Sequence, residues 1–146
     1  MLKRIHPVAG AIALLVIATF WISTVASELF GSPETVAAVK LAIPWGFLLL
    51  VPALVATGGS GMKLAAGRRG GPLGKKMKRM PLIAANGLLV LIPAALFLAA
   101  KARAGVFDTS FYAVQTLELV AGAVNLVLLW RNFQDGLRLS GRRRRV

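Results

Sequence analysis

Long runs of uncharged, mostly apolar residues constrain the fold of this chain more than any other feature. Residues 7–27, 41–62 and 80–100 contain no Asp, Glu, Lys or Arg, and residues 109–130 contain only Glu118. A helix that crosses about 30 Å of hydrocarbon needs roughly twenty mostly apolar residues. The sequence therefore predicts one all-α domain, an integral membrane four-helix bundle that occupies the whole chain. The expected spans cover about residues 7–27, 36–58, 81–101 and 109–131.

The composition agrees with a bundle that is surrounded by lipid. Hydrophobic residues make up 57% of the chain and the mean hydropathy is +0.72, whereas a soluble domain is about half apolar. The net charge is +13, but the Lys and Arg residues lie between and beyond the apolar runs rather than on one face of a soluble fold. We therefore expect no nucleic-acid partner. Because the chain has no cysteine, it cannot form a disulfide, a thiolate metal site or a cysteine nucleophile.

The positive charges predict how the bundle is oriented in the membrane. Most Lys and Arg residues lie in residues 3–4, in the connection 63–79 and in residues 131–145, whereas Lys101 and Arg103 flank the opposite ends of the spans. Cytoplasmic segments carry the excess of Lys and Arg in membrane proteins. We expect a multi-pass protein of a bacterial inner membrane with both termini in the cytoplasm. The basic segments would then contact anionic lipid head groups.

The first apolar run also has features of a cleavable signal peptide. It follows a basic start and ends near the small residues of "TVASE", residues 24–28, as a cleavage site does. We expect this run to be retained as the first span. Its removal would leave three spans and place the N-terminus outside.

A polar stripe runs along the fourth span. Gln115, Glu118, Gly122 and Asn125 follow one another at spacings of three, four and three residues, which places them on one face of a helix. Ionisable groups are costly within a bilayer and face the interior of a bundle. We therefore expect this face to point towards the other helices.

Polar residues elsewhere provide candidate partners for this stripe. We expect Lys40, near the start of the second span, to form an ion pair with Glu118, and Glu28 is the rival partner of Lys40. Asn86 and Asn125 lie at similar depths and are expected to share a hydrogen bond. The stripe is either a buried structural pair that fixes helix register or part of a path for protons or substrate. No carboxylate pair or nucleophile–base pair occurs in the spans, so no hydrolytic enzyme is predicted.

The chain contains a single histidine, His6, which lies at the predicted cytoplasmic edge of the first span, directly before Pro7. It is either a head-group residue at the membrane surface or a ligand. Zinc would need three or four ligands, but one imidazole is enough for a haem iron. Because a bundle can hold a cofactor between facing helices, His6 is our candidate ligand to the iron of a haem b near the cytoplasmic side. In a homodimer, our expected oligomer, two His6 side chains could meet on shared or adjacent haems.

Other residues at the same predicted depth suit the same cofactor. Met80 is the candidate for the opposite axial position, and Met62 and Trp130 lie at the same depth. Haem propionates are anionic and pair with arginine. The candidates for this role are Arg4, Arg79 and Arg131.

Four stretches of the chain carry a resemblance to other proteins. At "RIHPVAG", "SELFG", "KRMPLIAANGLLVLIPA" and "VQTLELVAG", the chain resembles small four-helix inner-membrane proteins of bacteria whose activity is uncharacterised. The resemblance covers most of the chain. It implies the architecture and the location described above, but no activity and no site residues.

Three functions from different classes remain open. The first is a haem b protein of the membrane with a role in electron transfer or redox sensing. The second is a cofactor-free accessory or assembly subunit of a larger membrane complex. The third is a small transporter that uses Lys40 and Glu118 in its path.

Overall fold

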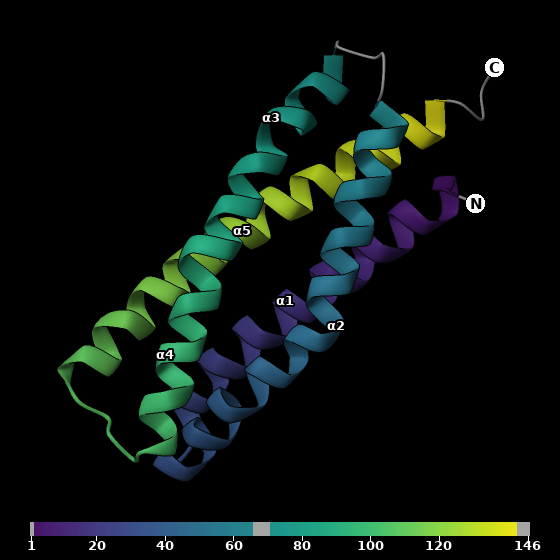
Figure 1. Ribbon diagram of the computed structural model, residues 1–146. Helices are drawn as coiled ribbons and strands as arrows, with labels where there is room; N and C mark the ends of the chain where they lie inside the picture. The colour runs from purple at the N-terminus through teal and green to yellow at the C-terminus, as the bar shows by residue number, and fades with distance from the viewer. Residues whose placement is uncertain (1, 66–70, 143–146) are drawn as a thin grey trace.

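Helices account for nearly all of the residues that the structure describes. The computed structural model describes residues 2–65 and 71–142. They form α1 (Leu2–Phe30), α2 (Pro33–Ala65), α3 (Gly71–Asn86), the π-helical segment η1 (Gly87–Leu91), α4 (Ile92–Arg103) and α5 (Thr109–Arg142) (Figure 1). α3, η1 and α4 follow one another without a break, so they form one rod. The predicted all-α class is confirmed.

Four helical stretches are long and apolar enough to cross a membrane, as the sequence predicts. They are Arg4–Phe30, Pro33–Leu64, Lys78–Arg103 and Thr109–Arg138. Each one contains the corresponding predicted span and most extend beyond it at both ends, because a helix continues into the polar residues that flank an apolar run.

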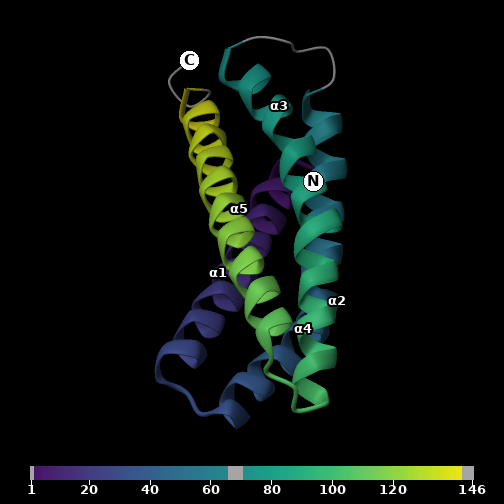
Figure 2. The same cartoon turned by 90° about the vertical axis from the view of Figure 1, so that its left-hand side faces the viewer.

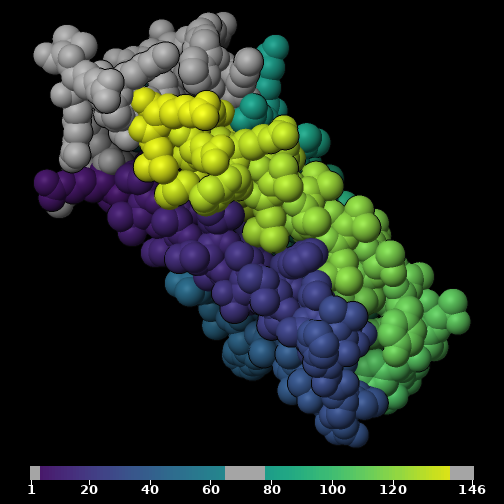
Figure 3. Space-filling model, turned by 180° about the vertical axis from the view of Figure 1, so that it is seen from behind, coloured from purple at the N-terminus to yellow at the C-terminus, as the bar shows by residue number. Residues whose placement is uncertain are grey.

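The four rods alternate in direction along the bundle (Figure 1, Figure 2). Both ends of the described chain, together with the end of α2 and the beginning of α3, lie at one end, which we call the terminal end. The α1–α2 turn at residues 31–32 and the α4–α5 connection at residues 104–108 lie at the opposite end, which we call the turn end. α1 contacts α2, α2 contacts α4, and α5 contacts α1, α3 and α4. The contact between α1 and α5 runs along much of the molecule in Figure 3.

The tight turn between α1 and α2 follows from its local sequence. The N–H of Gly31 donates to the carbonyl oxygen of Ser27 at 2.8 Å, and a Cβ on Gly31 would lie 2.5 Å from that oxygen, so no larger residue fits. Ser32 Oγ accepts a hydrogen bond from the N–H of Thr35 at 3.4 Å and caps α2. Pro33 occupies the first helical position, where a missing N–H costs nothing.

The α4–α5 connection is also held by side chains. Gly105 has a φ of +68°, which favours glycine. Asp108 caps α5, because its Oδ1 accepts from the N–H of Phe111 at 3.0 Å and from Ser110 Oγ at 2.6 Å. Lys101 Nζ donates to Asp108 Oδ2 at 2.6 Å. These hydrogen bonds, that from Lys101 above all, lower the pKa of Asp108 below its ordinary range.

Apolar packing joins the rods around this framework. One cluster of buried residues in the middle of α1 and α2 includes Ile17 and Leu50. A second, at the turn end, contains Val36, Leu98 and Phe111 from α2, α4 and α5. Many other large apolar side chains point outwards, as expected of helices whose surroundings are lipid.

Candidate functional site

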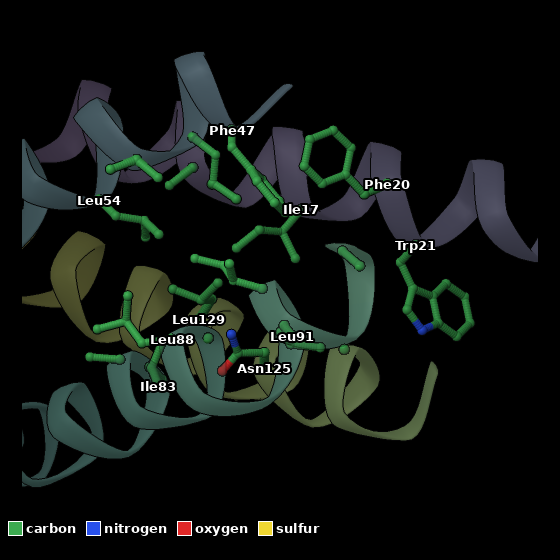
Figure 4. A pocket seen from close by; sticks show the side chains of 18 of the residues that line it. Ile17, Phe20, Trp21, Phe47, Leu54, Ile83, Leu88, Leu91, Asn125 and Leu129 are labelled. Carbon is green, nitrogen blue, oxygen red and sulfur yellow. The ribbon is translucent and has the colours of Figure 1, made fainter. Parts of the chain in front are cut away.

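A cavity of about 340 Å³ lies in the middle of the bundle, between α1, α2, the α3–η1–α4 rod and α5 (Figure 4). Nearly all of its lining is apolar, with Phe20 of α1, Leu54 of α2 and Leu129 of α5 among the side chains that surround it. The volume falls within the range of about 300–1,000 Å³ that is usual for small-molecule sites. Such a space can hold one small apolar molecule.

The π-helical segment η1 forms part of the cavity wall. Gly87, Leu88 and Leu91 line the cavity, and the N–H of Ile92 donates to the carbonyl oxygen of Gly87, five residues back. Pro93 follows directly and has no N–H to continue an α-helical ladder. π-helical turns inside α-helices occur frequently at functional sites. No pattern in the sequence predicted η1.

Lys40 and Glu118 form an ion pair beside the cavity, on its turn-end side. Lys40 Nζ lies 2.6 Å from Glu118 Oε2 and 3.5 Å from Thr24 Oγ1. Lys40 is 1% exposed, and Glu118 and Thr24 line the cavity. The ion pair that the sequence favoured is thus present. Glu28, the rival partner, interacts electrostatically with both charges.

Three further side chains of α5, those of Gln115, Asn125 and Asn132, are buried with unused hydrogen-bonding atoms. Asn125 is 2% exposed and lines the cavity (Figure 4), and its Oδ1 has no hydrogen-bond partner among the described residues. Gln115 is 4% exposed, and neither of its amide atoms has a partner in residues 2–65 or 71–142. A buried polar atom without a partner costs about 1–3 kcal/mol. Such an atom in a native structure calls for an explanation such as a ligand or water.

The hydrogen bond that we expected between Asn86 and Asn125 does not form. Asn86 Nδ2 instead donates to the backbone carbonyl oxygen of Ala121 at 2.9 Å. The small side chain at position 121 leaves this oxygen within reach of the α3–η1–α4 rod. A side-chain amide can therefore be satisfied by a backbone group that a sequence pattern does not reveal.

Sequence reasoning also missed Trp21. Its Nε1–H donates to the backbone carbonyl oxygen of Leu119 at 2.9 Å, and its ring lines the cavity (Figure 4). A Cβ on Gly122 would lie 2.9 Å from Trp21 Cδ1. Gly122 of the polar stripe gives the indole room to reach α5. This glycine was the sequence feature that could have indicated the contact.

His6 packs against α2 rather than into the cavity. Its Nδ1 lies 3.1 Å from the carbonyl oxygen of Thr57 and 3.1 Å from Ser60 Oγ. A Cβ on Gly61 would lie 3.0 Å from His6 Cε1, so this glycine lets the ring approach the helix closely. The imidazole thus ties the start of α1 to the last turns of α2.

The other haem candidates differ in their contacts and in their exposure. Met80 lines the cavity, and its Sδ accepts a hydrogen bond from Asn132 Nδ2 at 3.3 Å. Met62 and Trp130 are largely exposed. Arg79 forms an ion pair with Asp135 at 2.9 Å. Arg4 and Arg131 are exposed. Of the described haem candidates, Met80 is the one that lines the cavity, and haem binding stays a prediction.

No known protein family, curated protein or solved structure matches the chain. The class that the fold and the site define is an all-α protein with four helices of membrane-spanning length and an apolar internal cavity. The resemblance to bacterial inner-membrane proteins stays a prediction, as do the orientation in the membrane, the homodimer and the accessory-subunit hypothesis.

Proposed function

We propose that the protein is an intramembrane carrier that binds one small, mostly apolar molecule in the cavity between its four rods. The observation that carries this proposal is the apolar cavity of about 340 Å³, whose lining includes the buried side chain of Asn125. Sites for small molecules usually combine an apolar lining with a few well-placed polar groups. Asn125 and Glu118 supply such groups here, and the pair of Lys40 with Glu118 suits the small-transporter function that the sequence left open.

Two adjacent glycines allow a matched test of this proposal. A Cβ at Gly58 or at Gly59 would meet nothing within 4 Å, but only Gly58 is among the described residues that line the cavity. Gly58→Leu should therefore fill part of the cavity, whereas Gly59→Leu should leave it open. Both changes raise helix propensity by a similar amount.

The measurement is native mass spectrometry of the full chain, released from neutral-lipid nanodiscs that were incubated with adamantanol. We expect one bound adamantanol in the wild type and in Gly59→Leu, and none in Gly58→Leu. Equal binding by both variants, or none by the wild type, would contradict the proposal.

Haem binding, with a role in electron transfer or redox sensing, is a second candidate. The observation that favours it is the 3.1 Å contact between His6 Nδ1 and the Thr57 carbonyl oxygen, because metal-ligating histidines are usually held in this way through their second ring nitrogen. Met80, the candidate opposite ligand, lines the cavity. The His6 ring is not part of that lining, so haem binding has weaker support than the carrier function.

Visible absorption spectra separate these two candidates. The purified protein is measured oxidised and then dithionite-reduced, beside His6→Ala and Met80→Ala. A Soret band with reduced α and β bands that is lost in His6→Ala would support a haem b. A colourless protein from haem-replete cells would remove haem binding and leave the carrier function.

A further inference from the structure

The cavity presents a carboxylate rather than an ammonium group to a bound molecule. Glu118 lines the cavity, and 12% of its side-chain surface is accessible. The Lys40 side chain is 0% accessible and is not part of the described lining, because its Nζ lies against Glu118 and Thr24. A molecule in the cavity therefore meets the negative member of the ion pair.

Carboxylates outnumber ammonium groups at this side of the cavity. Glu28 interacts electrostatically with both Lys40 and Glu118, so two acidic groups share one basic group. Oε1 of Glu28 is buried and has no hydrogen-bond partner within the described part of the chain. A second acidic group beside the ion pair favours a cation over an anion at this side of the cavity.

Asn125 adds a second polar side chain to the same cavity. It follows Glu118 by two turns of α5, which is about 10 Å along the helix axis at about 1.5 Å per residue. Its Oδ1 lacks a partner among the described residues, and its side chain lies among those that line the cavity (Figure 4). The nearby Nε1–H of Trp21 is already used by the carbonyl oxygen of Leu119. Glu118 and Asn125 therefore form the polar part of an otherwise apolar lining, as is usual for small-molecule sites.

We propose that the ligand of the cavity is a lipophilic cation, an apolar molecule that carries a protonated amine. Its ammonium group binds Glu118 on the side where Glu28 lies, and its apolar body packs among the aromatic and aliphatic side chains of the lining. This inference rests on the proposed carrier function, because it names the chemical class of the molecule that the cavity binds.

Three probes with the same apolar cage separate the effect of charge from that of shape. They are aminoadamantane, which is protonated at neutral pH, adamantanol, and adamantane carboxylate. Isothermal titration calorimetry of the full chain in nanodiscs of phosphatidylcholine gives their affinities, after subtraction of the heat measured with empty nanodiscs. We expect the amine to bind at least about tenfold more tightly than the alcohol, and the carboxylate to bind most weakly. Gly58→Leu should remove the binding of every probe, and Gly59→Leu should preserve it.

Variants of the charged groups test the assignment directly. Glu118→Gln leaves Lys40 buried without its counter-ion, so the double variant Lys40→Met/Glu118→Gln, which removes both charges, accompanies it. We expect the double variant to lose the preference for the amine over adamantanol. Glu28→Gln should weaken the binding of the amine more than that of the alcohol.

The possible outcomes distinguish this inference from the function on which it rests. Equal binding of the amine and the alcohol, or tighter binding of the carboxylate, would overturn the cation assignment and leave the carrier function intact. The cation assignment also fails if the double variant keeps the preference for the amine. If no probe binds to the wild type, the carrier function fails and the cation assignment fails with it.

Discussion

Lys40 is the buried charge around which the polar centre of the bundle is organised. Its Nζ is satisfied by Glu118 Oε2 at 2.6 Å and by Thr24 Oγ1 at 3.5 Å. Removal of one member of a buried ion pair leaves the other charge without a counter-ion, whereas removal of both leaves a neutral site that packs well. The pair is therefore expected to behave as one unit.

Single and double variants of the pair should differ sharply in stability. We expect Lys40→Met and Glu118→Gln each to lower the free energy of unfolding by about 3–5 kcal/mol. The double variant should lose less than either single variant, because it leaves no unpaired charge. Reversible unfolding in mixed micelles, followed by tryptophan fluorescence, gives the double-mutant cycle. Additive losses would show that the two charges do not interact.

The cap of α5 should make stability depend on pH. The hydrogen bonds from Lys101, Ser110 and the N–H of Phe111 lower the pKa of Asp108 in the folded protein. The ionised carboxylate therefore stabilises the fold above its ordinary pKa of about 4, and this stabilisation is lost as the pH falls towards the lowered value.

Asp108→Asn isolates this charge, because asparagine is an equally good helix cap. At neutral pH we expect the variant to unfold a few degrees below the wild type. The difference should shrink as the pH falls below about 4. Thermal unfolding between pH 7 and pH 3 tests this, and a difference that does not change with pH would refute the role of the charge.

Single residues also show how far the sequence could predict the site. The pair of Lys40 with Glu118 was predictable, because few ionisable groups lie within the spans and each needs a partner. The partners of Asn86 and Trp21 were not, because both are backbone carbonyl oxygens of α5. The carbonyl oxygen that a side chain can reach depends on how closely two helices pack against each other. That distance cannot be read from a single sequence.

The helical elements, too, were predictable from the sequence only in part. The apolar runs correctly predict four helices that are long and apolar enough to cross a membrane, because the length of a span is set by the thickness of the hydrocarbon layer. They do not predict η1, which differs from an α-helix by one hydrogen-bond register over Gly87–Leu91. The cavity was also unpredictable, because it results from the shapes of side chains on all of the rods.

The contact between α1 and α5 should be sensitive to one added methyl group. A Cβ on Gly122 would lie 2.9 Å from Trp21 Cδ1, and the indole is fixed by its hydrogen bond to Leu119. We therefore expect Gly122→Ala to lower the free energy of unfolding by about 1–3 kcal/mol, the usual cost of overpacking.

Gly59→Ala is the matched control for this effect, since a Cβ there meets nothing within 4 Å. It should be neutral or slightly stabilising, because alanine has the higher helix propensity. Thermal unfolding in detergent compares the two variants with the wild type. Equal stability of Gly122→Ala and Gly59→Ala would mean that α1 and α5 are not in close contact at this position.

At the scale of the whole molecule, the alternation of four rods brings both ends of the described chain to one end of the bundle (Figure 1). Within the described part of the chain, the Lys and Arg residues of 3–4, 63–65, 71–79 and 131–142 belong to the segments at this terminal end. Acidic Glu34 and Asp108 belong to the turn end, together with Lys101 and Arg103. Because cytoplasmic segments carry the excess of Lys and Arg, this arrangement predicts an orientation with the terminal end in the cytoplasm.

Because the chain has no cysteine, single introduced cysteines can report this orientation without background. Ala104→Cys and Arg138→Cys are changes at exposed positions near the turn end and the terminal end respectively. Each variant is expressed in a bacterial host, and spheroplasts are treated with a membrane-impermeant maleimide. We expect the cysteine at position 104 to react in intact spheroplasts, and that at position 138 to react only after permeabilisation.

The reverse pattern would place the basic segments outside, and the distribution of Lys and Arg would then no longer explain the orientation. Reaction of both cysteines in intact spheroplasts would place both positions on the same side, which contradicts a single membrane crossing by α5.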